Sequence, residues 1–385
     1  MLSSHQPNYF SYHINKEVKE VFWYALIFGL ALNLTFLFEP IYLFKLGYSI
    51  PKILFFYVQV YAWYALIVTF VAKIISRIGY KHSILTSSIF YILFWLSLYN
   101  VGNYQVLFYI TPLVLALQKS FFWPAYNADI ALNSDKTQRG REVGALFSLM
   151  EIVAIFAPFI GGFISTVYDF KVLFIVSSTL ILVAAYPLFK SPEIYTKHHF
   201  HFRNFSNLFK KYKNNFFAYW GYAEDLMLQS LWPIFIFITV PSVLGVGVVA
   251  TIGSLMSMML MLYVGHLADH ENKKRMIKLS SVFYSLTWIF RFLAKNITGV
   301  LAFDVLTKTG KASLNVPMVS YTYEIAGDDG PDHAIAYSVF FEFSLAIGKI
   351  IMGLLGILVL TFSSNIFIVF AIAGLMTLLY GLLRK

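Results

Sequence analysis

The sequence predicts an all-α integral membrane protein, with twelve transmembrane helices arranged as two six-helix, pseudo-symmetric bundles. Three observations support this prediction: the composition, the repeated apolar runs and an internal repeat. Of the 385 residues, 59% are hydrophobic and only 12% are charged, whereas a typical soluble domain is about 25% charged. Because so few charges cannot cover a water-facing surface, the apolar residues are expected to face a lipid bilayer.

The apolar residues form runs of roughly 20 residues, the length with which a helix crosses a hydrocarbon core of about 30 Å. In chain order the predicted spans are 21–44, 51–72, 82–100, 104–127, 142–167, 169–188, 215–239, 242–265, 275–294, 297–325, 333–361 and 364–383. The first run is long and no small-residue cleavage site follows it, which predicts a retained span and not a signal peptide. The longest polar stretch, 189–214, separates six spans from six. We therefore expect a domain at 1–188, a cytoplasmic linker at 189–214 and a domain at 215–385.

The chain is basic, with 29 Lys and Arg, 19 Asp and Glu, and a net charge of +10. About 20 of the 29 lie in the N-terminal tail, the even-numbered loops, the linker and the C-terminus, which by the positive-inside rule places both termini in the cytoplasm. This bias also explains the charge without nucleic-acid binding. The chain has no cysteine, so disulfides and thiolate metal sites are excluded.

The two halves of the chain repeat each other at an offset of 193 residues. The features that match at this offset are Pro40 with Pro233, the loop 72–82 with 265–275, and Pro124 with Pro317. With a two-residue gap, Glu151 in span 5 also aligns with Glu342 in span 11. Two tandem six-span units of one orientation predict a site at their interface, near the bilayer midplane.

Two matching loops of this repeat show the pattern G-x-x-x-D-x-x-G-x-[RK] to different degrees. Between spans 8 and 9 it appears as Gly265, Asp269 and Lys274, and between spans 2 and 3 only Gly79 and Lys81 remain. Together with the tandem repeat, this pattern resembles the major facilitator superfamily over essentially the whole chain. The resemblance implies a multi-pass protein of the cytoplasmic membrane that moves a small-molecule substrate by alternating access, and we expect a monomer.

The same resemblance implies roles for particular residues. In the family, the first-half loop aspartate helps lock one end of the cavity; here Ser76 replaces it, which leaves Asp269 to take the equivalent role in the second half. Spans 1, 4, 7 and 10 line the cavity in the family. The Pro158-x-x-Gly161-Gly162 segment of span 5 is similar to the tail of an exporter-associated motif, so it favours export, although close helix packing explains the glycines equally well.

Carboxylates inside the spans are the first candidates for function. Glu151 lies about nine residues into span 5, roughly 14 Å deep, and Glu342 lies at the matching depth. A charge at the midplane costs at least about 2.5–3.5 kcal/mol, so each residue is either a proton carrier or a hydrogen-bonded structural group; its presence in both halves favours the carrier. Because Lys349 shares a helical face with Glu342, we expect Glu342 to be ion-paired and Glu151 to be freer.

Charges in other spans predict a polar cavity. Asp304, Lys308 and Lys311 lie on one face of span 10, and Lys119 lies in span 4. They are either substrate contacts or, for Asp304 and Lys308, a structural bridge. One face of span 7 also combines polar and aromatic groups, namely Tyr222, Asp225, Gln229 and Trp232. Asp225, and not its neighbour Glu224, is expected to face the cavity and is a third candidate for proton binding.

The remaining candidates are weaker. Glu39 and Arg291 lie near the outer ends of their spans, which favours snorkelling to the surface. The predicted linker contains three histidines, His198, His199 and His201, and there a solvated segment is favoured over a metal site. No nucleotide, dinucleotide or metalloprotease motif is present, so no cofactor is expected.

The sequence thus predicts a secondary active transporter of a polar or charged small molecule, driven by protons through Glu151, Glu342 or Asp225. An uncoupled facilitator with structural carboxylates is one alternative, and a non-transporting receptor or assembly factor of the same fold is another. An enzyme is not expected, because no nucleophile–base pair or set of metal ligands is present.

Overall fold

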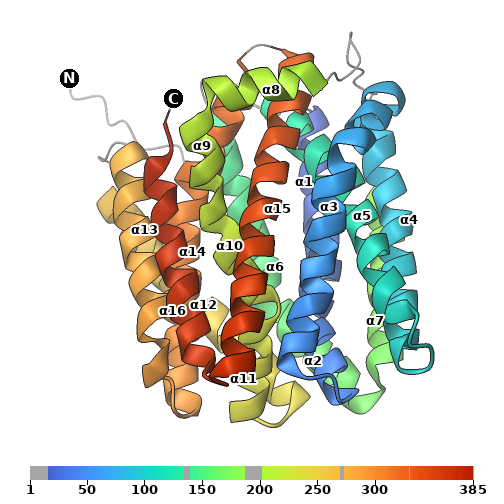
Figure 1. The fold of residues 1–385 in the computed structure, drawn as a ribbon, viewed down its shortest axis with the longest axis vertical. Helices are drawn as coiled ribbons and strands as arrows, with labels where there is room; N and C mark the ends of the chain where they lie inside the picture. The colour runs from blue at the N-terminus through green and yellow to red at the C-terminus, as the bar shows by residue number, and fades with distance from the viewer. Residues whose placement is uncertain (1–15, 134–138, 187–201, 269–272, 329, 385) are drawn as a thin grey trace, which may run out of the picture.

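The computed structural model describes residues 16–133, 139–186, 202–268, 273–328 and 330–384, and these residues form helices and no strands. Figure 1 shows the helices side by side, with the first half of the chain on one side and the second half on the other. The first half contains α1 (Lys16–Thr35), α2 (Phe38–Lys45), α3 (Ile50–Ile78), α4 (Tyr80–Tyr99), α5 (Leu107–Asn133), α6 (Arg139–Val167) and α7 (Phe170–Ala185).

The second half repeats this order. It contains α9 (Lys213–Ala218), α10 (Ala223–Gln229), α11 (Leu231–Thr239), α12 (Val243–Ala268), α13 (Lys273–Ile289), α14 (Ile297–Ala326), α15 (Pro331–Phe362) and α16 (Ile366–Thr377). The helices α11 and α12 begin 193 residues after α2 and α3, which is the offset of the sequence repeat. The predicted fold class is therefore confirmed. The limits of the two domains stay a prediction, because much of the linker lies outside the described residues.

The first and seventh spans are broken helices, and the breaks have the same cause. The helix is interrupted at Phe36 and Leu37 between α1 and α2, and at Ser230 between α10 and α11, although Leu37 and Ser230 keep dihedral angles of the right-handed helical region. Pro40 and Pro233 follow these breaks. Proline has no N–H group and its ring clashes with the carbonyl four residues earlier, which is Phe36 in one half and Gln229 in the other. Each proline thus interrupts the helical hydrogen-bond pattern at the matching point of its span.

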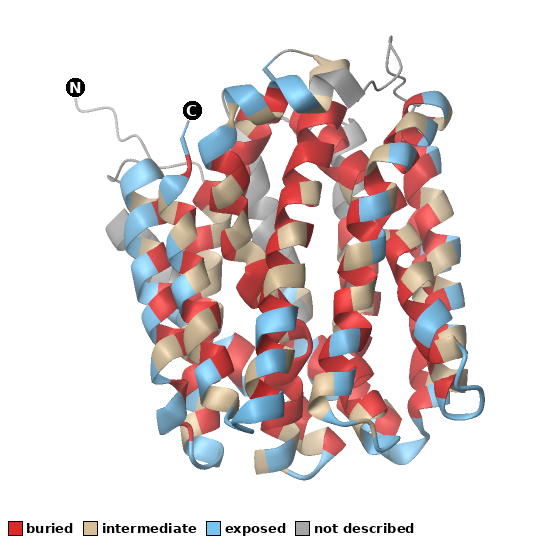
Figure 2. Ribbon diagram, in the orientation of Figure 1, coloured by how far each residue is buried: buried red, intermediate tan, exposed pale blue. Residues whose placement is uncertain are grey.

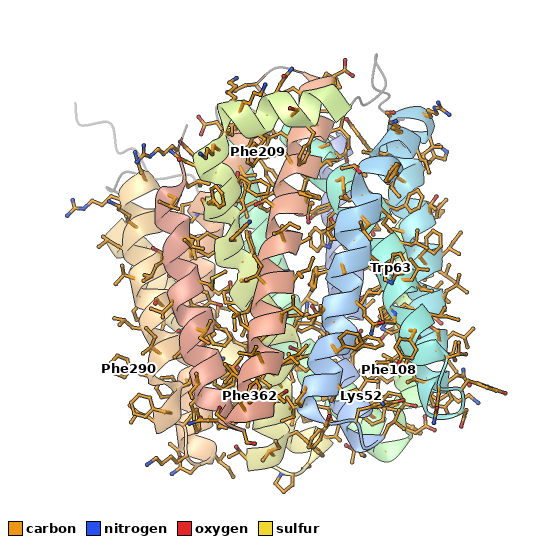
Figure 3. All side chains as sticks on the ribbon, viewed as in Figure 1. Lys52, Trp63, Phe108, Phe209, Phe290 and Phe362 are labelled. Atoms are coloured by element: carbon orange, nitrogen blue, oxygen red, sulfur yellow. The ribbon has the colours of Figure 1, made fainter. Side chains whose placement is uncertain are left out.

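Apolar side chains cover the outer surface of the bundle. Figure 2 shows exposed residues on the outward faces of the helices and buried residues between them, and Figure 3 places Phe290 at the outer edge. The exposed side chains include Leu66 and Phe70 of α3, which are 61% and 60% exposed. Large apolar side chains exposed in this number are expected where the solvent is lipid.

Five described segments are long and apolar enough to cross a membrane, and three shorter apolar helices accompany them. The thirty-residue helix α14 is not among these, because Asp304, Lys308 and Lys311 lower its hydropathy. Such a helix can still span a bilayer if its polar side faces protein or water. The charges of α14 therefore point to an interior role for this helix.

Part of the predicted linker is a helix. The ten-residue helix α8 (Phe202–Lys211) lies across one end of the bundle in Figure 1. Its Phe205 ring packs against Phe340 and Phe343 of α15, and its Phe209 ring packs edge-on against Phe216 of α9. The end of the linker is thus attached to the second half by aromatic contacts.

Glycines allow α6 to pack closely against two helices. A Cβ atom at Gly161 would lie 2.2 Å from the Leu34 carbonyl oxygen of α1. On the neighbouring side, a Cβ atom at Gly247 of α12 would lie 2.4 Å from the Pro158 carbonyl oxygen. The Pro158–Gly162 segment therefore has a packing role at the junction of the two halves.

Candidate transport site

A cavity of about 330 Å³ lies between the two halves of the chain. Its lining residues come from α1, α3, α4 and α5 of the first half and from α10, α14 and α15 of the second, with Tyr222 just before α10. Nearly half of the lining residues are aromatic, namely Phe28, Phe36, Tyr61, Tyr64, Tyr91, Phe122, Trp123, Tyr126, Tyr222, Tyr323 and Phe341. The polar groups among these rings determine what the cavity can bind.

One polar cluster is centred on Glu342, whose side chain is 3% exposed. The Tyr64 hydroxyl donates a hydrogen bond to Oε2 of Glu342 over 2.9 Å, and Nδ2 of Asn127 donates to Oε1 over 2.8 Å. The Tyr323 hydroxyl in turn donates to Oδ1 of Asn127 over 2.8 Å. Because Tyr64 and Asn127 belong to the first half, the Glu342 carboxyl group joins the two halves. We call Glu342, Tyr64, Asn127 and Tyr323 the Glu342 cluster.

A second cluster is centred on Asp225, which lies between two lysines. The Lys311 and Lys349 ammonium groups lie 2.8 and 2.6 Å from its carboxylate oxygens, and Lys311 also lies 3.0 Å from Glu224. Lys349 additionally donates to the Tyr61 hydroxyl over 3.2 Å. We call Asp225, Glu224, Lys311 and Lys349 the Asp225 cluster.

The predicted ion pair between Glu342 and Lys349 is wrong. The two residues share a face of α15, but the Lys349 ammonium group lies against Asp225 of α10 instead. The Asp225 carboxylate, on a neighbouring helix, lies 2.6 Å from the Lys349 ammonium group. Glu342 is two turns away from Lys349 on the same helix, about 10 Å along its axis. As expected, Asp225 lines the cavity and Glu224 does not, although the buried Glu224 shares Lys311 with Asp225.

Lys119 differs from the other two lysines that line the cavity. It forms no ion pair and no hydrogen bond with any described residue, and its Nζ atom lies 5.5 Å from the centre of the Tyr61 ring. Its charge acts electrostatically on Glu39 and Glu342, and it contacts neither. Among the described lining residues, Lys119 is therefore the one cation whose charge is not matched by a contacting carboxylate.

Three of the predicted cavity residues form a separate cluster. Lys308 and Asp304 form an ion pair of 2.7 Å, the Trp232 indole N–H donates to Asp304 over 2.9 Å, and Lys308 also donates to the Ala250 carbonyl of α12 over 2.7 Å. None of the three is among the residues that line the described cavity. Asp304 and Lys311 share a face of α14 but differ by about 10 Å along its axis, so that α12 covers Asp304 while Lys311 reaches the cavity.

Glu39 and Arg291 do not snorkel to the surface, contrary to expectation. Glu39 is 2% exposed and accepts hydrogen bonds from the Trp95 indole over 2.9 Å and from Thr35 over 3.1 Å. Arg291 is fully buried, with its guanidinium carbon 3.4 Å from the centre of the Trp288 ring, and it donates to Thr307 over 2.7 Å. Partners inside the bundle hold both groups, although Nε and Nη1 of Arg291 have no hydrogen-bond partner among the described residues, and a position near the end of a span does not reveal this.

The remaining predicted residues are placed as follows. The Glu151 side chain and Asp269 lie outside what the structure describes, as do His198, His199 and His201, whereas Gly265 lies in the last turn of α12. Within the described residues no group of His, Cys, Asp and Glu could hold a metal ion. The other members of the loop pattern are at helix ends: Gly79, with φ of 89°, joins α3 to α4, Lys81 is buried in the first turn of α4, and Lys274 is exposed at the start of α13. Their gating role stays a prediction.

Several lining residues were not predicted from the sequence. Tyr64 and Asn127 donate to Glu342, Tyr323 donates to Asn127, and Tyr61 accepts from Lys349 and donates to Gln229. Tyrosines in membrane helices are usually packing or interface residues, so the residue type alone does not indicate a place in the cavity. The position of Asn127, three residues after Pro124 in span 4, was the available signal, because a buried amide in a membrane helix needs a partner.

Comparisons with known proteins agree with this architecture. The sequence profile described as Major Facilitator Superfamily matches residues 21–240, and comparison with curated proteins gives no match. Two solved structures of similar fold are the E. coli fucose:proton symporter FucP, with TM-score 0.65 and 13% identity over 94% of this chain and 96% of that chain, and the nucleoside transporter NupG, with TM-score 0.67 and 12% identity over 95% and 98%.

A third similar structure is the human organic anion transporter MFSD10, with TM-score 0.66 and 12% identity over 98% of this chain and 99% of that chain. At these identities the structures establish the shared fold, and the sequence profile covers more than half of the chain. With its apolar spans, its tandem halves and its central cavity, the chain belongs to the Major Facilitator Superfamily of membrane transporters.

Proposed function

We propose that the protein is a proton-coupled secondary active transporter of a polar or charged small molecule, and that Glu342 binds the coupled proton. The observation that supports this proposal is the position of Glu342 in the cavity. Among the described lining residues it is the carboxyl group that forms no ion pair, and its two oxygens accept hydrogen bonds from the opposite half. A symporter of similar fold, FucP, moves fucose with protons, which agrees with proton coupling.

Proton binding at Glu342 would weaken the contact between the halves. The ionised carboxylate accepts from Tyr64 on one oxygen and from Asn127 on the other. A protonated carboxyl group carries a donor on one oxygen and accepts less well there, so one of the two bonds is lost or reversed. Because both donors belong to the first half, the proton shifts the equilibrium toward states in which α15 is separated from α3 or α5.

We rank the other candidates for proton binding below Glu342. Asp225 lies within 2.8 Å of two ammonium groups, and these favour its ionised form in every step that keeps the cluster intact. Glu151 aligns with Glu342 in the repeat, and we retain it as a candidate on that ground. Lys119, Lys311, Tyr222 and Gln229 line the cavity with Asp225 and are the proposed substrate contacts.

For membrane placement we keep the orientation expected from the charge bias, with both termini in the cytoplasm and the protein in the cytoplasmic membrane as a monomer. The direction of net transport follows the gradients of proton and substrate in this proposal. The segment that favours export, Pro158–Gly162, packs closely against α1 and α12, so export has less support than the transport function itself.

Transport assays of Glu342→Gln in proteoliposomes test the coupling. The substrate is first found by screening the purified wild-type protein for ligand-induced thermal stabilisation. We then expect the variant to lose uptake driven by an imposed pH gradient while it keeps counterflow exchange, because exchange needs no net proton movement. Glutamine retains the shape of the side chain and accepts one of the two hydrogen bonds.

Glu39→Gln is the matched control, because Glu39 is an equally buried glutamate that is held by Trp95 and Thr35 and is not among the cavity-lining residues. We expect this variant to keep gradient-driven uptake. If the wild type responds to the pH gradient and both variants respond as it does, neither carboxyl group carries the coupled proton; if the wild type itself does not respond, the protein is an uncoupled facilitator. Loss of coupling in Glu39→Gln alone would move the proton site to the first half.

A further inference from the structure

We propose that the substrate is a ring-containing monocarboxylate with a hydroxyl or N–H donor, and that Lys119 binds its carboxylate. This inference rests on the proposed transport function and names the substrate class of the same cavity. Three observations support it: an unmatched cation, an aromatic wall beside that cation, and a buried acceptor without a donor. Each of them requires something that the described residues do not supply.

The unmatched cation is Lys119. The other two lysines of the cavity are bound to Asp225 at 2.8 and 2.6 Å, whereas the Lys119 ammonium group has no contacting acceptor among the described residues. A lysine inside the membrane is costly without a counter-charge. An anion that enters from water would form with Lys119 the charge-assisted hydrogen bond that is missing.

The charge balance favours an anion with a single negative charge. Lys311 and Lys349 are neutralised by Asp225 and Glu224 within 3.0 Å, so one lysine remains for the ligand. A phosphate ester with two charges would need a second free cation, and the described lining residues offer only Lys119. A carboxylate matches the single free ammonium group.

The wall beside Lys119 favours a ring. Phe122 and Trp123 follow Lys119 by three and four residues on α5, so their side chains are its neighbours on the helix surface. Phe122 stacks on Phe28 at 4.5 Å and on Tyr126 at 5.1 Å between ring centres, which makes a rigid aromatic platform. The volume of about 330 Å³ lies at the lower end of the range of about 300–1,000 Å³ for small-molecule sites, which suits a molecule of one or two rings.

The acceptor without a donor is the Asn315 side-chain oxygen. It is buried, it belongs to a cavity-lining residue of α14, and it has no hydrogen-bond partner in the described part of the chain. An unsatisfied buried acceptor costs about 1–3 kcal/mol, and a hydroxyl or N–H group of the ligand would satisfy it. Lys119 on α5 and Asn315 on α14 would then hold opposite parts of one ligand from the two halves.

Matched pairs of probes test the inference with the full-length protein in detergent, by thermal shift without any gradient. The pairs are 4-hydroxybenzoate with 4-hydroxybenzamide, for a flat aromatic ring, and glucuronate with glucuronamide, for a sugar ring. We expect at least one acid to stabilise the wild-type protein at a concentration roughly tenfold or more below that of its amide. Which acid binds distinguishes the two kinds of ring.

Variants then assign the preference to Lys119. Lys119→Met keeps the apolar stem and removes the charge, and it should bring the acid and the amide to within about twofold of each other, whereas Lys119→Arg should keep the preference. Lys308→Met is the matched control, because Lys308 is a partly buried lysine that does not line the cavity. It should keep the preference even if its unfolding temperature falls.

Three results would overturn the inference: an amide that binds as well as its acid, an acid preference that survives Lys119→Met, or no stabilisation by either acid. The wild-type comparison stands if a variant fails to fold. Because binding is measured without a pH gradient, a failure here leaves the proton-coupling test at Glu342 intact. The reverse also holds, since an acid preference at Lys119 does not depend on which residue carries the proton.

Discussion

The Glu342 and Asp225 clusters lie in the same cavity and both contact the opposite half, but they do so with different chemistry. Asp225 is held by two ammonium groups, and Lys349 of that cluster then reaches Tyr61 of α3. Glu342 is held by the neutral donors of Tyr64 and Asn127. A carboxylate between two cations keeps its charge, whereas one between neutral donors can accept a proton without leaving a buried charge unmatched. The first arrangement suits a fixed framework and the second a switch.

The largest expected effect separates these two roles by breaking the Asp225 cluster. Asp225→Ala removes the counter-charge of two buried lysines, and removal of one partner of a buried ion pair typically costs about 3–5 kcal/mol. We expect a marked fall in the unfolding temperature, measured in detergent by a thermal-shift assay. The double variant Asp225→Ala with Lys349→Met should recover part of the loss. If the double variant recovers none of the lost stability, the cluster does not hold these helices together.

The second expected effect is at Arg291. This buried charged residue lies outside the cavity and can be compared with the two clusters inside it. Arg291→Leu removes the stacking on Trp288 and the bond to Thr307, and it also removes a buried charge, so the two contributions oppose each other. We expect a change in unfolding free energy of about 1–2 kcal/mol with the wild-type substrate affinity retained. Loss of binding without loss of stability would place Arg291 in the transport site instead.

A smaller effect is expected at the switch itself. Tyr64→Phe removes one hydrogen bond to Glu342, and a bond of this kind contributes about 0.5–1.5 kcal/mol, or more if the acceptor is charged. The pH at which proton-driven uptake is half-maximal should move, because a donor to the carboxylate favours its ionised form; without that donor, proton binding becomes easier and the midpoint rises. An unchanged midpoint would contradict a role for Glu342 in coupling.

The smallest effect on transport is expected at the Asp304–Lys308 pair, which lies outside the described cavity. The Lys308 side chain is 29% exposed, but the Asp304 side chain is only 5% exposed, so Lys308→Gln leaves a buried carboxylate that keeps the hydrogen bond from the Trp232 indole. We expect the variant to leave uptake and its pH dependence unchanged, with a loss of thermal stability no larger than that of Asp225→Ala. A tenfold or greater change in transport rate would show that this second cluster takes part in transport.

The broad architecture could be predicted because it depends on local properties of the sequence, namely composition, hydropathy and the spacing of residues close together in the chain. The lengths and hydropathy of the runs predict spans, and the 193-residue repeat predicts two similar halves; α2 and α11 begin at equivalent positions as a result. The prolines that break spans 1 and 7 act on a carbonyl only four residues away. Of the predicted face of span 7, Tyr222, Asp225 and Gln229 line the cavity, whereas Trp232 does not.

Which charges pair with which could not be predicted, because the partners are far apart in the chain. Lys349 and Asp225 are 124 residues apart, and Glu342 and Asn127 are 215 apart. Helical periodicity gives the face of a residue but not the depth at which a neighbouring helix presents its partner. Thus Lys349 was assigned to Glu342 on its own helix, and Glu39 and Arg291 to the surface.

By itself the sequence determined the class of the protein, the approximate spans, the tandem repeat and the presence of charges inside the membrane, since these follow from composition and local periodicity. The tertiary structure alone decided that Asp225 occupies the lysines, that Glu342 is held by neutral donors and that Lys119 is left without a partner. The physical reason is that ion pairs and hydrogen bonds act over about 3 Å, and only the packing of the helices brings groups from distant parts of the chain within that distance.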